Sequence, residues 1–296
     1  MNKPKIHHTG VVLMPDVPLH VYAIEGSHFS VLIDTGITPM KNEILSMCDK
    51  AGGIRYVLIT HAHADHIGCN RAVRDHTGAT FLAGGALPWI EDYETHIREF
   101  CLQEETGDYT PGQAAEVRSI MDEPVRVDIT LREGDLIRPG GETVLETIAV
   151  PGHKLEELAF LEHSTGILFM GDLFLALKAP FFHGFQTASG FHNSLHKIEN
   201  LLESGRAKSV YAAHFNPLDA GQAMAVINET RSFLDQVRDH TLDAVNGNDL
   251  TTIWKTVCSK MHKDLEFRGY AMISVQLAEL ENAGLIRNEG GLWQHG

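Results

Sequence analysis

Short apolar runs separated by turn residues organise the first third of the chain. Five of these runs are rich in β-branched and aromatic residues, the composition typical of buried strands; they lie at residues 10–14, 21–24, 31–36, 56–60 and 80–83. Residues 39–51 carry apolar side chains at helical spacing, and a second helix is expected just after Gly68. This alternation of strands and helices predicts an α/β domain built in layers.

Residues 86–125 interrupt the alternation with a helical pattern and no strand pattern. Trp89, Tyr93, His96 and Phe100 follow one another at spacings of four, three and four, so they share one face of a helix. That face either packs the insert onto the domain or forms a lid over a binding pocket for an apolar acyl or aryl group. The sequence leaves both interpretations open.

The remainder of the chain first returns to strand patterns and then becomes helical. Strands are expected at residues 125–129, 142–150, 166–172 and 209–213. Helices are expected at 222–245, 250–261 and 272–283, with a small hairpin at 285–293. We therefore divide the chain into a larger domain at residues 1–220 and a C-terminal helical cap at residues 221–296.

The segment after the strand at 56–60 concentrates candidate metal ligands. Its sequence is His61-Ala62-His63-Ala64-Asp65-His66. Two histidines at positions i and i+2 beyond a strand point the same way, so His61 and His63 can reach one ion. Asp65 and His66 lie on the following turn, where they can serve a second ion. Imidazoles and carboxylates are ligands that zinc accepts.

The pattern His61-x-His63-x-Asp65-His66 resembles the signature of the metallo-β-lactamase superfamily over about residues 8–220. The resemblance implies an αββα sandwich with a one- or two-metal site. It further implies ligands that each follow a strand, at His153, Asp172 and His214. The implied set is His61, His63 and His153 for one ion, Asp65, His66 and His214 for the other, and Asp172 shared between both.

The resemblance also implies a cofactor and a supporting residue. Two divalent ions are expected, with zinc favoured by five imidazoles and two carboxylates, and iron or manganese left open. Asp34 is expected behind the site, where it accepts the free N–H of a ligand imidazole; a turn-forming aspartate is the alternative.

The expected chemistry is hydrolysis. A hydroxide bridging two divalent ions attacks a carbonyl carbon or a phosphorus, with Asp65 and Asp172 as the catalytic carboxylates. We expect a thioesterase or esterase acting on a small, partly apolar substrate. Lactonase activity is disfavoured, because Leu175 stands where the resembled lactonases carry Tyr. Two alternatives are a phosphodiesterase or endoribonuclease of the same fold, and a ligand-binding regulator with a vestigial metal site.

A substrate pocket is expected around the loop that follows Asp172, which is rich in aromatic residues. Its candidate residues are Trp89, Tyr93, Phe181, Phe182 and His183. Ordinary packing of these aromatic side chains is the alternative.

Charge narrows the range of partners. The formal net charge is -15, and residues 86–125 alone supply -8, which argues against nucleic acid or an anionic membrane surface. The C-terminal hairpin and its helices resemble the winged-helix appendage of some family members, but residues 246–296 carry five Lys/Arg against six Asp/Glu. We interpret this unit as a structural or dimer-forming cap. Without a signal-peptide pattern, a spanning run or a Cys-x-x-Cys pair, the expected location is the cytoplasm.

Overall fold

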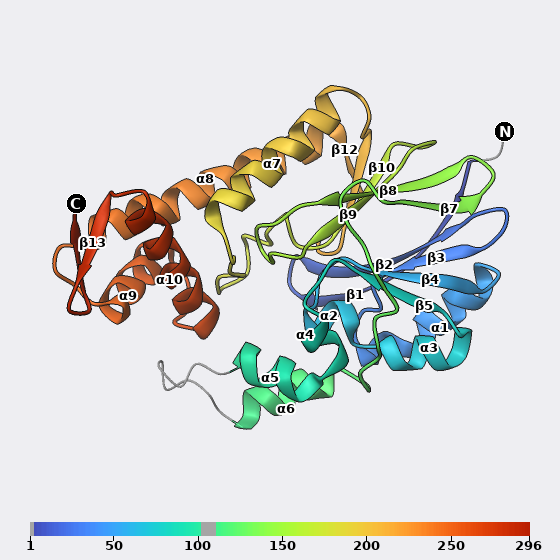
Figure 1. The fold of residues 1–296 in the computed structure, drawn as a ribbon, viewed down its shortest axis with the longest axis horizontal. Coiled ribbons are helices and arrows are strands. Elements are labelled where there is room, and N and C mark those ends of the chain that lie inside the picture. Colours follow the sequence, from blue (N-terminus) through green and yellow to red (C-terminus); the bar gives the residue numbers. More distant parts are fainter. Residues whose placement is uncertain (1–2, 102–110) are drawn as a thin grey trace.

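Two six-stranded mixed sheets pack face to face, and helices cover both outer faces (Figure 1). The computed structural model describes the backbone of residues 3–101 and 111–296, and the side chains of residues 3–97 and 114–296. The αββα arrangement expected from the sequence is confirmed.

The first sheet has the order β1-β2-β3-β4-β5-β6. β1 to β3 pair antiparallel, and β3 to β6 are parallel. Its strands are β1 (Lys5–Met14), β2 (Val17–Glu25), β3 (Ser30–Ile33), β4 (Ile54–Ile59), β5 (Thr80–Ala83) and β6 (Ile129–Thr130). The helical elements that connect these strands are η1 (Thr38–Met40), α1 (Lys41–Lys50), α2 (Ala64–Ile67) and α3 (Asn70–Thr77).

The second sheet has the order β12-β11-β10-β9-β8-β7, with β10 and β11 parallel and the other pairs antiparallel. Its strands are β7 (Leu136–Gly140), β8 (Thr143–Ala149), β9 (Leu158–Glu162), β10 (Ile167–Met170), β11 (Ser209–Ala212) and β12 (Leu218–Asp219). Two long helices, α7 (Ala188–Glu203) and α8 (Ala220–Ala244), pack on its outer side.

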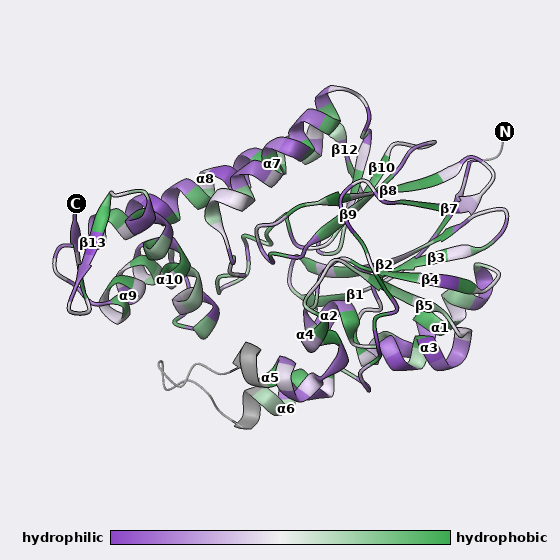
Figure 2. Ribbon diagram, in the orientation of Figure 1, coloured by the Kyte–Doolittle hydropathy of each residue, from purple (hydrophilic) through white to green (hydrophobic). Residues whose placement is uncertain are grey.

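The strands are apolar at consecutive positions because both faces of each sheet are covered. Val31 and Ile33 face the opposite sheet, whereas Leu32 between them packs under the helices outside the first sheet. In β10, Phe169 faces inward and Leu168 packs toward α7 and α8. Figure 2 shows the same division, with hydrophobic strands inside and hydrophilic surfaces on outer helices such as α3 and α8.

The insert is helical, as its pattern predicts. It contains α4 (Leu87–Glu91), α5 (Tyr93–Cys101) and α6 (Pro111–Ser119). The aromatic stripe is broken between α4 and α5 at Asp92, whose carboxylate accepts hydrogen bonds from the backbone N–H groups of Glu94 and Thr95. The side chain of Phe100, the last member of the stripe, lies outside the described residues.

The C-terminal region follows the predicted order of helices and hairpin, with α9 (Leu250–Met261), α10 (Phe267–Asn282), β13 (Ile286–Glu289) and β14 (Leu292–His295). Its first attachment is to the loop after β10: Lys263 Nζ donates to the carbonyl oxygens of Leu177 and Ala179, and the Asp264 N–H donates to Pro180.

A second attachment joins α10 to the start of α7. Glu279 Oε1 accepts from Ala188 N at 2.8 Å and from Thr187 Oγ1 at 2.9 Å, and Glu279 Oε2 accepts from Ser189 N at 2.9 Å. A carboxylate from α10 therefore caps the N-terminus of another helix, where exposed N–H groups favour a negative charge.

One expectation about an individual element was wrong, and two of the elements were not predicted. Residues 125–128 are not strand, because Asp128 and its neighbours instead connect the insert to β6. The helix α7 and the strand β9 were not predicted.

Among the described residues, none of the helices is both long enough and apolar enough to cross a bilayer.

Candidate metal centre

The loop between β4 and α2 is held by the carboxylate of Asp34. Thr60 donates to it twice, from its backbone N–H to Oδ1 and from its hydroxyl to Oδ2, each at 2.8 Å. His63 then precedes α2, where the His66 N–H donates to the His63 carbonyl at 2.9 Å. The loop thus places His61 and His63 before a short helix that carries Asp65 and His66.

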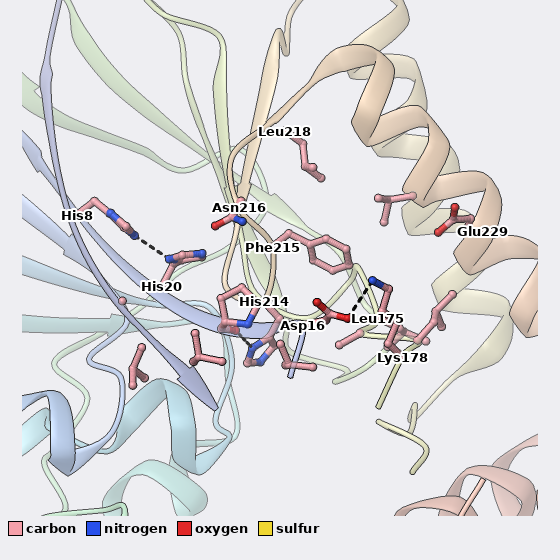
Figure 3. A pocket seen from close by; sticks show the side chains of 18 residues that line it. His8, Asp16, His20, Leu175, Lys178, His214, Phe215, Asn216, Leu218 and Glu229 are labelled. Carbon is pink, nitrogen blue, oxygen red and sulfur yellow. Dashed lines mark hydrogen bonds and ion pairs between the residues drawn. The ribbon is translucent and has the colours of Figure 1, made fainter. Parts of the chain in front are cut away.

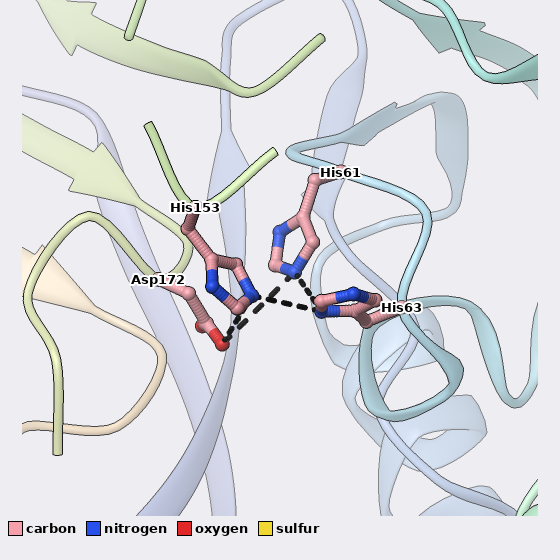
Figure 4. A group of neighbouring side chains, drawn as sticks. All are labelled: His61, His63, His153 and Asp172. Atoms are coloured by element: carbon pink, nitrogen blue, oxygen red, sulfur yellow. Dashed lines mark hydrogen bonds and ion pairs between the residues drawn. The ribbon is translucent and has the colours of Figure 1, made fainter. Parts of the chain in front are cut away.

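Four of the candidate ligands converge on one point, as Figure 4 shows. His63 Nδ1 lies 3.1 Å from His61 Nε2 and 2.9 Å from His153 Nε2. Asp172 Oδ2 lies 3.5 Å from His153 Nε2 and 4.0 Å from His61 Nε2. Three imidazoles and one carboxylate oxygen therefore surround a space of the size that a divalent ion fills.

A second group lies beside the first and consists of Asp65, His66 and His214. Asp65 Oδ2 lies 3.3 Å from His214 Nε2 and 3.8 Å from His66 Nε2. The other oxygen of Asp172, Oδ1, lies 3.2 Å from His66 Nε2 and 3.3 Å from His214 Nε2. One carboxylate thus faces both groups, each with a different oxygen.

The outward ring nitrogens have acceptors that orient the imidazoles. His66 Nδ1 lies 2.8 Å from Asp34 Oδ2, His153 Nδ1 lies 3.0 Å from the Gly184 carbonyl, and His214 Nδ1 lies 2.8 Å from the Pro18 carbonyl. Each outer N–H that donates to oxygen leaves Nε2 free to present a lone pair inward. Asp34 therefore makes the contact behind the site that the sequence predicts.

The electrostatics of the two groups differ. Burial lowers the pKa of His61 and His63 well below the ordinary imidazole value. Burial acts in the same direction on His66 and His214, but the carboxylates of Asp172 and Asp65 act against it, and the pKa of both imidazoles is raised, that of His214 to about 10. The second group thus holds positive charge beside Asp172 when no metal is bound.

The donor set fits divalent metal ions. His66 Nε2 and Asp172 Oδ1 are fully buried and lie 3.2 Å apart, but within the described residues neither forms a hydrogen bond of good geometry, although buried polar atoms normally do. Imidazole nitrogens 2.9 to 3.1 Å apart with lone pairs converging also repel unless a cation or proton lies between them. Two ions, one in each group, would satisfy these atoms.

One supporting residue was not identified from the sequence. Glu157 is completely buried, and its Oε1 accepts from the backbone N–H groups of Asp172 at 2.7 Å and Leu173 at 3.0 Å. Burial raises the pKa of Glu157 well above its ordinary value. The sequence shows an acidic residue four positions after His153. It does not show that this residue contacts the backbone of Asp172 and Leu173 after the neighbouring strand.

A cavity of about 480 Å³ opens over the two groups. Phe181 and His183 line it from the loop after β10, and Trp89 lies beside it, with its ring centroid 6.3 Å from that of His63. Further walls come from the β1–β2 hairpin, from α6 and from the start of α10, through Leu13, Met14, Val17, Glu116, Val117, Ile120, Phe267 and Arg268.

Two predicted pocket residues lie elsewhere, which corrects the predicted pocket. Tyr93 is buried and donates its hydroxyl to the Ile67 carbonyl at 3.0 Å, so it packs the insert onto α2. Phe182 is buried beneath the second sheet, with its ring centroid 5.8 Å from that of Phe233. Adjacent residues of one loop point in opposite directions, and only Phe181 reaches the cavity.

A larger cavity, of about 730 Å³, lies on the other side of His214 (Figure 3). It is lined by His8 and His20, whose ring nitrogens are 2.7 Å apart, and by apolar residues such as Leu175. Because His214 uses Nε2 for the metal groups, this cavity meets only the back of the site.

Comparison with known protein families gives a match that covers most of the larger domain at residues 1–220. The family model described as the metallo-beta-lactamase superfamily matches residues 14–214. A hydroxyacylglutathione hydrolase of Gloeothece citriformis is 29% identical over 186 residues, covering 60% of this chain and 58% of that protein. The chain thus spans less than two thirds of that relative's length. An acyl-coenzyme A thioesterase of Gallus gallus is 26% identical, covering 68% of this chain and 74% of that protein.

Two solved structures resemble the whole chain. A metallo-beta-lactamase family protein from Thermus thermophilus superposes with a TM-score of 0.73 at 18% identity, covering 98% of both chains. A beta-lactamase domain protein from Burkholderia ambifaria gives a TM-score of 0.74 at 16% identity, covering 98% of this chain and 92% of that one. At these identities the likeness establishes the fold, including the C-terminal helices.

Proposed function

Because the chain belongs to the metallo-β-lactamase superfamily, we propose that it is a dinuclear metal-dependent hydrolase that cleaves an ester or thioester bond. The observation that carries the proposal is the placement of Asp172. Its two oxygens face two separate sets of histidines, at 3.2 to 4.0 Å from four imidazole nitrogens. A carboxylate shared in this way suits two ions side by side, and the imidazole-rich set favours zinc.

Two bound divalent ions would lower the pKa of a water and polarise the substrate's carbonyl oxygen. The residues of the chain then supply position and proton transfer. Asp65 is the candidate ligand whose carboxylate is most open to the cavity, with its side chain 25% exposed. It can orient the attacking water, accept its proton and pass that proton to the leaving group.

His183 borders the same cavity and is a candidate for binding the substrate's oxygen. Burial lowers the pKa of His183 to about 3, so the imidazole is neutral at physiological pH. Its Nε2 is buried and has no hydrogen-bond partner within the described residues. A neutral imidazole can donate one hydrogen bond without repelling the metal ions.

The cavity supports a small, partly apolar substrate. Its volume of about 480 Å³ falls in the range typical of small-molecule sites. Leu13, Met14, Val17 and Phe267 give it apolar walls. The two relatives, by their names, act on an acyl-coenzyme A thioester and on a hydroxyacylglutathione. Both names favour a thioester over other bonds.

A phosphodiesterase or endoribonuclease is less well supported. A nucleic-acid backbone is bound through Lys and Arg. The described residues around the cavity include Glu116 and Glu266 but a single cation of this kind, Arg268.

The proposal is tested with the full-length protein, metal analysis and three substrate classes: acyl-CoA thioesters, lactones and bis-aryl phosphates. We expect two ions per chain, thioester hydrolysis that a chelator abolishes and zinc restores, and a loss of about a thousandfold or more in Asp172→Ala. Asp75→Ala is the matched control, since Asp75 is exposed and, among the described residues, pairs with Arg71 alone. Faster cleavage of the phosphates would support the phosphodiesterase, and bound ions without any turnover would support a regulator.

A further inference from the structure

The cavity over the metal groups has a side arm. This space, of about 170 Å³, lies on the side of His63 and His153 and is called here the His153 arm. It shares His63, His153, His183, Phe267 and Arg268 with the main cavity. A substrate whose reacting bond lies over Asp172 can therefore extend a substituent into the His153 arm.

Two cationic side chains border the His153 arm. Among the described residues that line it, Lys154 and Arg268 are cations and none is an Asp or Glu. This composition contrasts with the net charge of -15 of the whole chain. Glu266, which pairs with Arg268, lines the main cavity and not the arm.

Arg268 is held in a fixed orientation. Its guanidinium carbon lies 3.9 Å from the centroid of the Phe181 ring. Its Nε donates to Glu266 Oε2 at 2.7 Å, and its Nη2 donates to Glu266 Oε1. Within the described residues two of the five N–H donors of the guanidinium are used in this way, which leaves three for another acceptor. A fixed planar fork of donors is the group that proteins use to bind carboxylates.

Lys154 borders the arm from a different element. It is only 4% exposed, and its Nζ lies 3.6 Å from the centroid of the Trp89 ring. Taking an ammonium group out of water is costly, and the face of an indole ring compensates for part of that cost. Each of the two cations thus lies over an aromatic ring, at positions set by packing.

We propose that the His153 arm binds a carboxylate carried by the substrate, with Arg268 as the residue that recognises it and Lys154 as a second contact. This inference rests on the proposed hydrolase and narrows its substrates to acidic acyl esters or thioesters. The size of the arm supports a short group, because 170 Å³ is the space of about five or six water molecules.

The test compares two thioesters that differ only in charge, the succinyl thioester of N-acetylcysteamine and its carboxamide counterpart. We expect the wild type to favour the acid in kcat/KM by tenfold or more. Arg268→Gln should lower kcat/KM for the acid by about ten- to hundredfold more than kcat/KM for the amide, as for loss of a charge-assisted hydrogen bond. Lys154→Met should act in the same direction.

The matched control is Arg55→Gln. Arg55 also lies over aromatic rings, 5.7 Å from the Phe29 centroid and 5.6 Å from the Tyr56 centroid, but at the end of β4 away from the ligand loop. Arg55→Gln should leave the preference for the acid over the amide unchanged. Equal wild-type rates with acid and amide, or an equal loss of both in Arg268→Gln, would overturn the carboxylate assignment.

Binding to the metal-free protein separates this inference from the hydrolase proposal. If neither thioester is hydrolysed, the hydrolase proposal fails, whereas the arm can still be tested by titration with glutarate, its monoamide and inorganic phosphate. Tighter binding of glutarate than of the monoamide, lost in Arg268→Gln, supports the inference. Equal binding of the two, or tighter binding of phosphate, contradicts it.

Discussion

His66 Nδ1 and Asp34 Oδ2 lie 2.8 Å apart, and the same carboxylate accepts two hydrogen bonds from Thr60. Asp34 therefore joins the end of β3 to the ligand loop after β4 and orients one ligand imidazole. Its backbone is left-handed, with φ of 58°, a conformation that Asp adopts more readily than bulky residues do.

Asp34→Asn should weaken binding of one ion and spare the other. An amide has one accepting oxygen, so it cannot accept the Thr60 backbone N–H at one position and the Thr60 hydroxyl and His66 N–H at the other. We expect the affinity of the second group to fall by about 10- to 100-fold and that of the first to change little. Metal titration by calorimetry measures both. Asp16→Asn is the control, because Asp16 is an exposed aspartate with φ of 63°; a similar loss there would contradict the prediction.

Metal binding should release protons at the second group only. The pKa values of His66 and His214 are raised, so both imidazoles are protonated near pH 7 and must lose protons to bind an ion. The pKa values of His61, His63 and His153 are lowered, chiefly by burial, so these imidazoles are already neutral.

The affinity for the second ion should accordingly rise with pH between about 6 and 9, below the folded pKa of His214, while that for the first stays nearly flat. Calorimetry in two buffers with different ionisation enthalpies counts the protons. Proton release on binding of the first ion, or its absence for the second, would show that the assignment of charge is wrong.

Gly171→Ala should disturb the first group directly. A Cβ at this position would lie 2.8 Å from His61 Nδ1 and 2.7 Å from Thr60 Oγ1, too close for either to remain in place. We expect a loss of about 1–3 kcal/mol in stability and weaker binding of the first ion. Denaturant unfolding and metal titration test the two effects. Gly221→Ala, where a Cβ meets only Asp219 Oδ1 at 3.4 Å, should be tolerated.

Glu279→Gln should loosen the attachment of α10 to α7. The substitution removes the charge at the N-terminus of α7 and one of two accepting oxygens, at a cost of about 1–2 kcal/mol. Thermal unfolding measures the loss. Glu281, on the same helix, accepts one hydrogen bond from the Asn288 N–H. Glu281→Gln should therefore change the stability by less than about 0.5 kcal/mol. Equal losses of stability in the two variants would argue against Glu279 as the N-terminal cap of α7.

Much of the centre could be predicted because each candidate ligand follows a strand. The strand at 80–83 and the helix at 250–261 have the predicted bounds. The helix α7 was missed although Phe191, Leu195 and Ile198 have helical spacing, since its glycine and polar residues obscured the pattern. Local periodicity therefore predicted individual strands and helices, whereas the αββα arrangement and the order of the ligands came from the resemblance to the metallo-β-lactamase superfamily.

Contacts between distant segments could not be predicted in the same way. Nothing in the sequence separates Phe181, which borders the cavity, from Phe182, which packs in the core. The position of Arg268 over Phe181 depends on how α10 lies against the loop after β10, and no local pattern encodes it. The C-terminal region was thus interpreted as structural, although the first turn of α10 forms a wall of the cavity.

The C-terminal region is attached to the loop after β10 by hydrogen bonds from Lys263 and Asp264 to Leu177, Ala179 and Pro180. This attachment has a consequence for how the cavity can vary. All candidate ligands lie within residues 61–214, whereas one wall of the cavity, with Phe267 and Arg268, belongs to the C-terminal region. Substitutions in that region can therefore alter the shape of the cavity without altering any ligand.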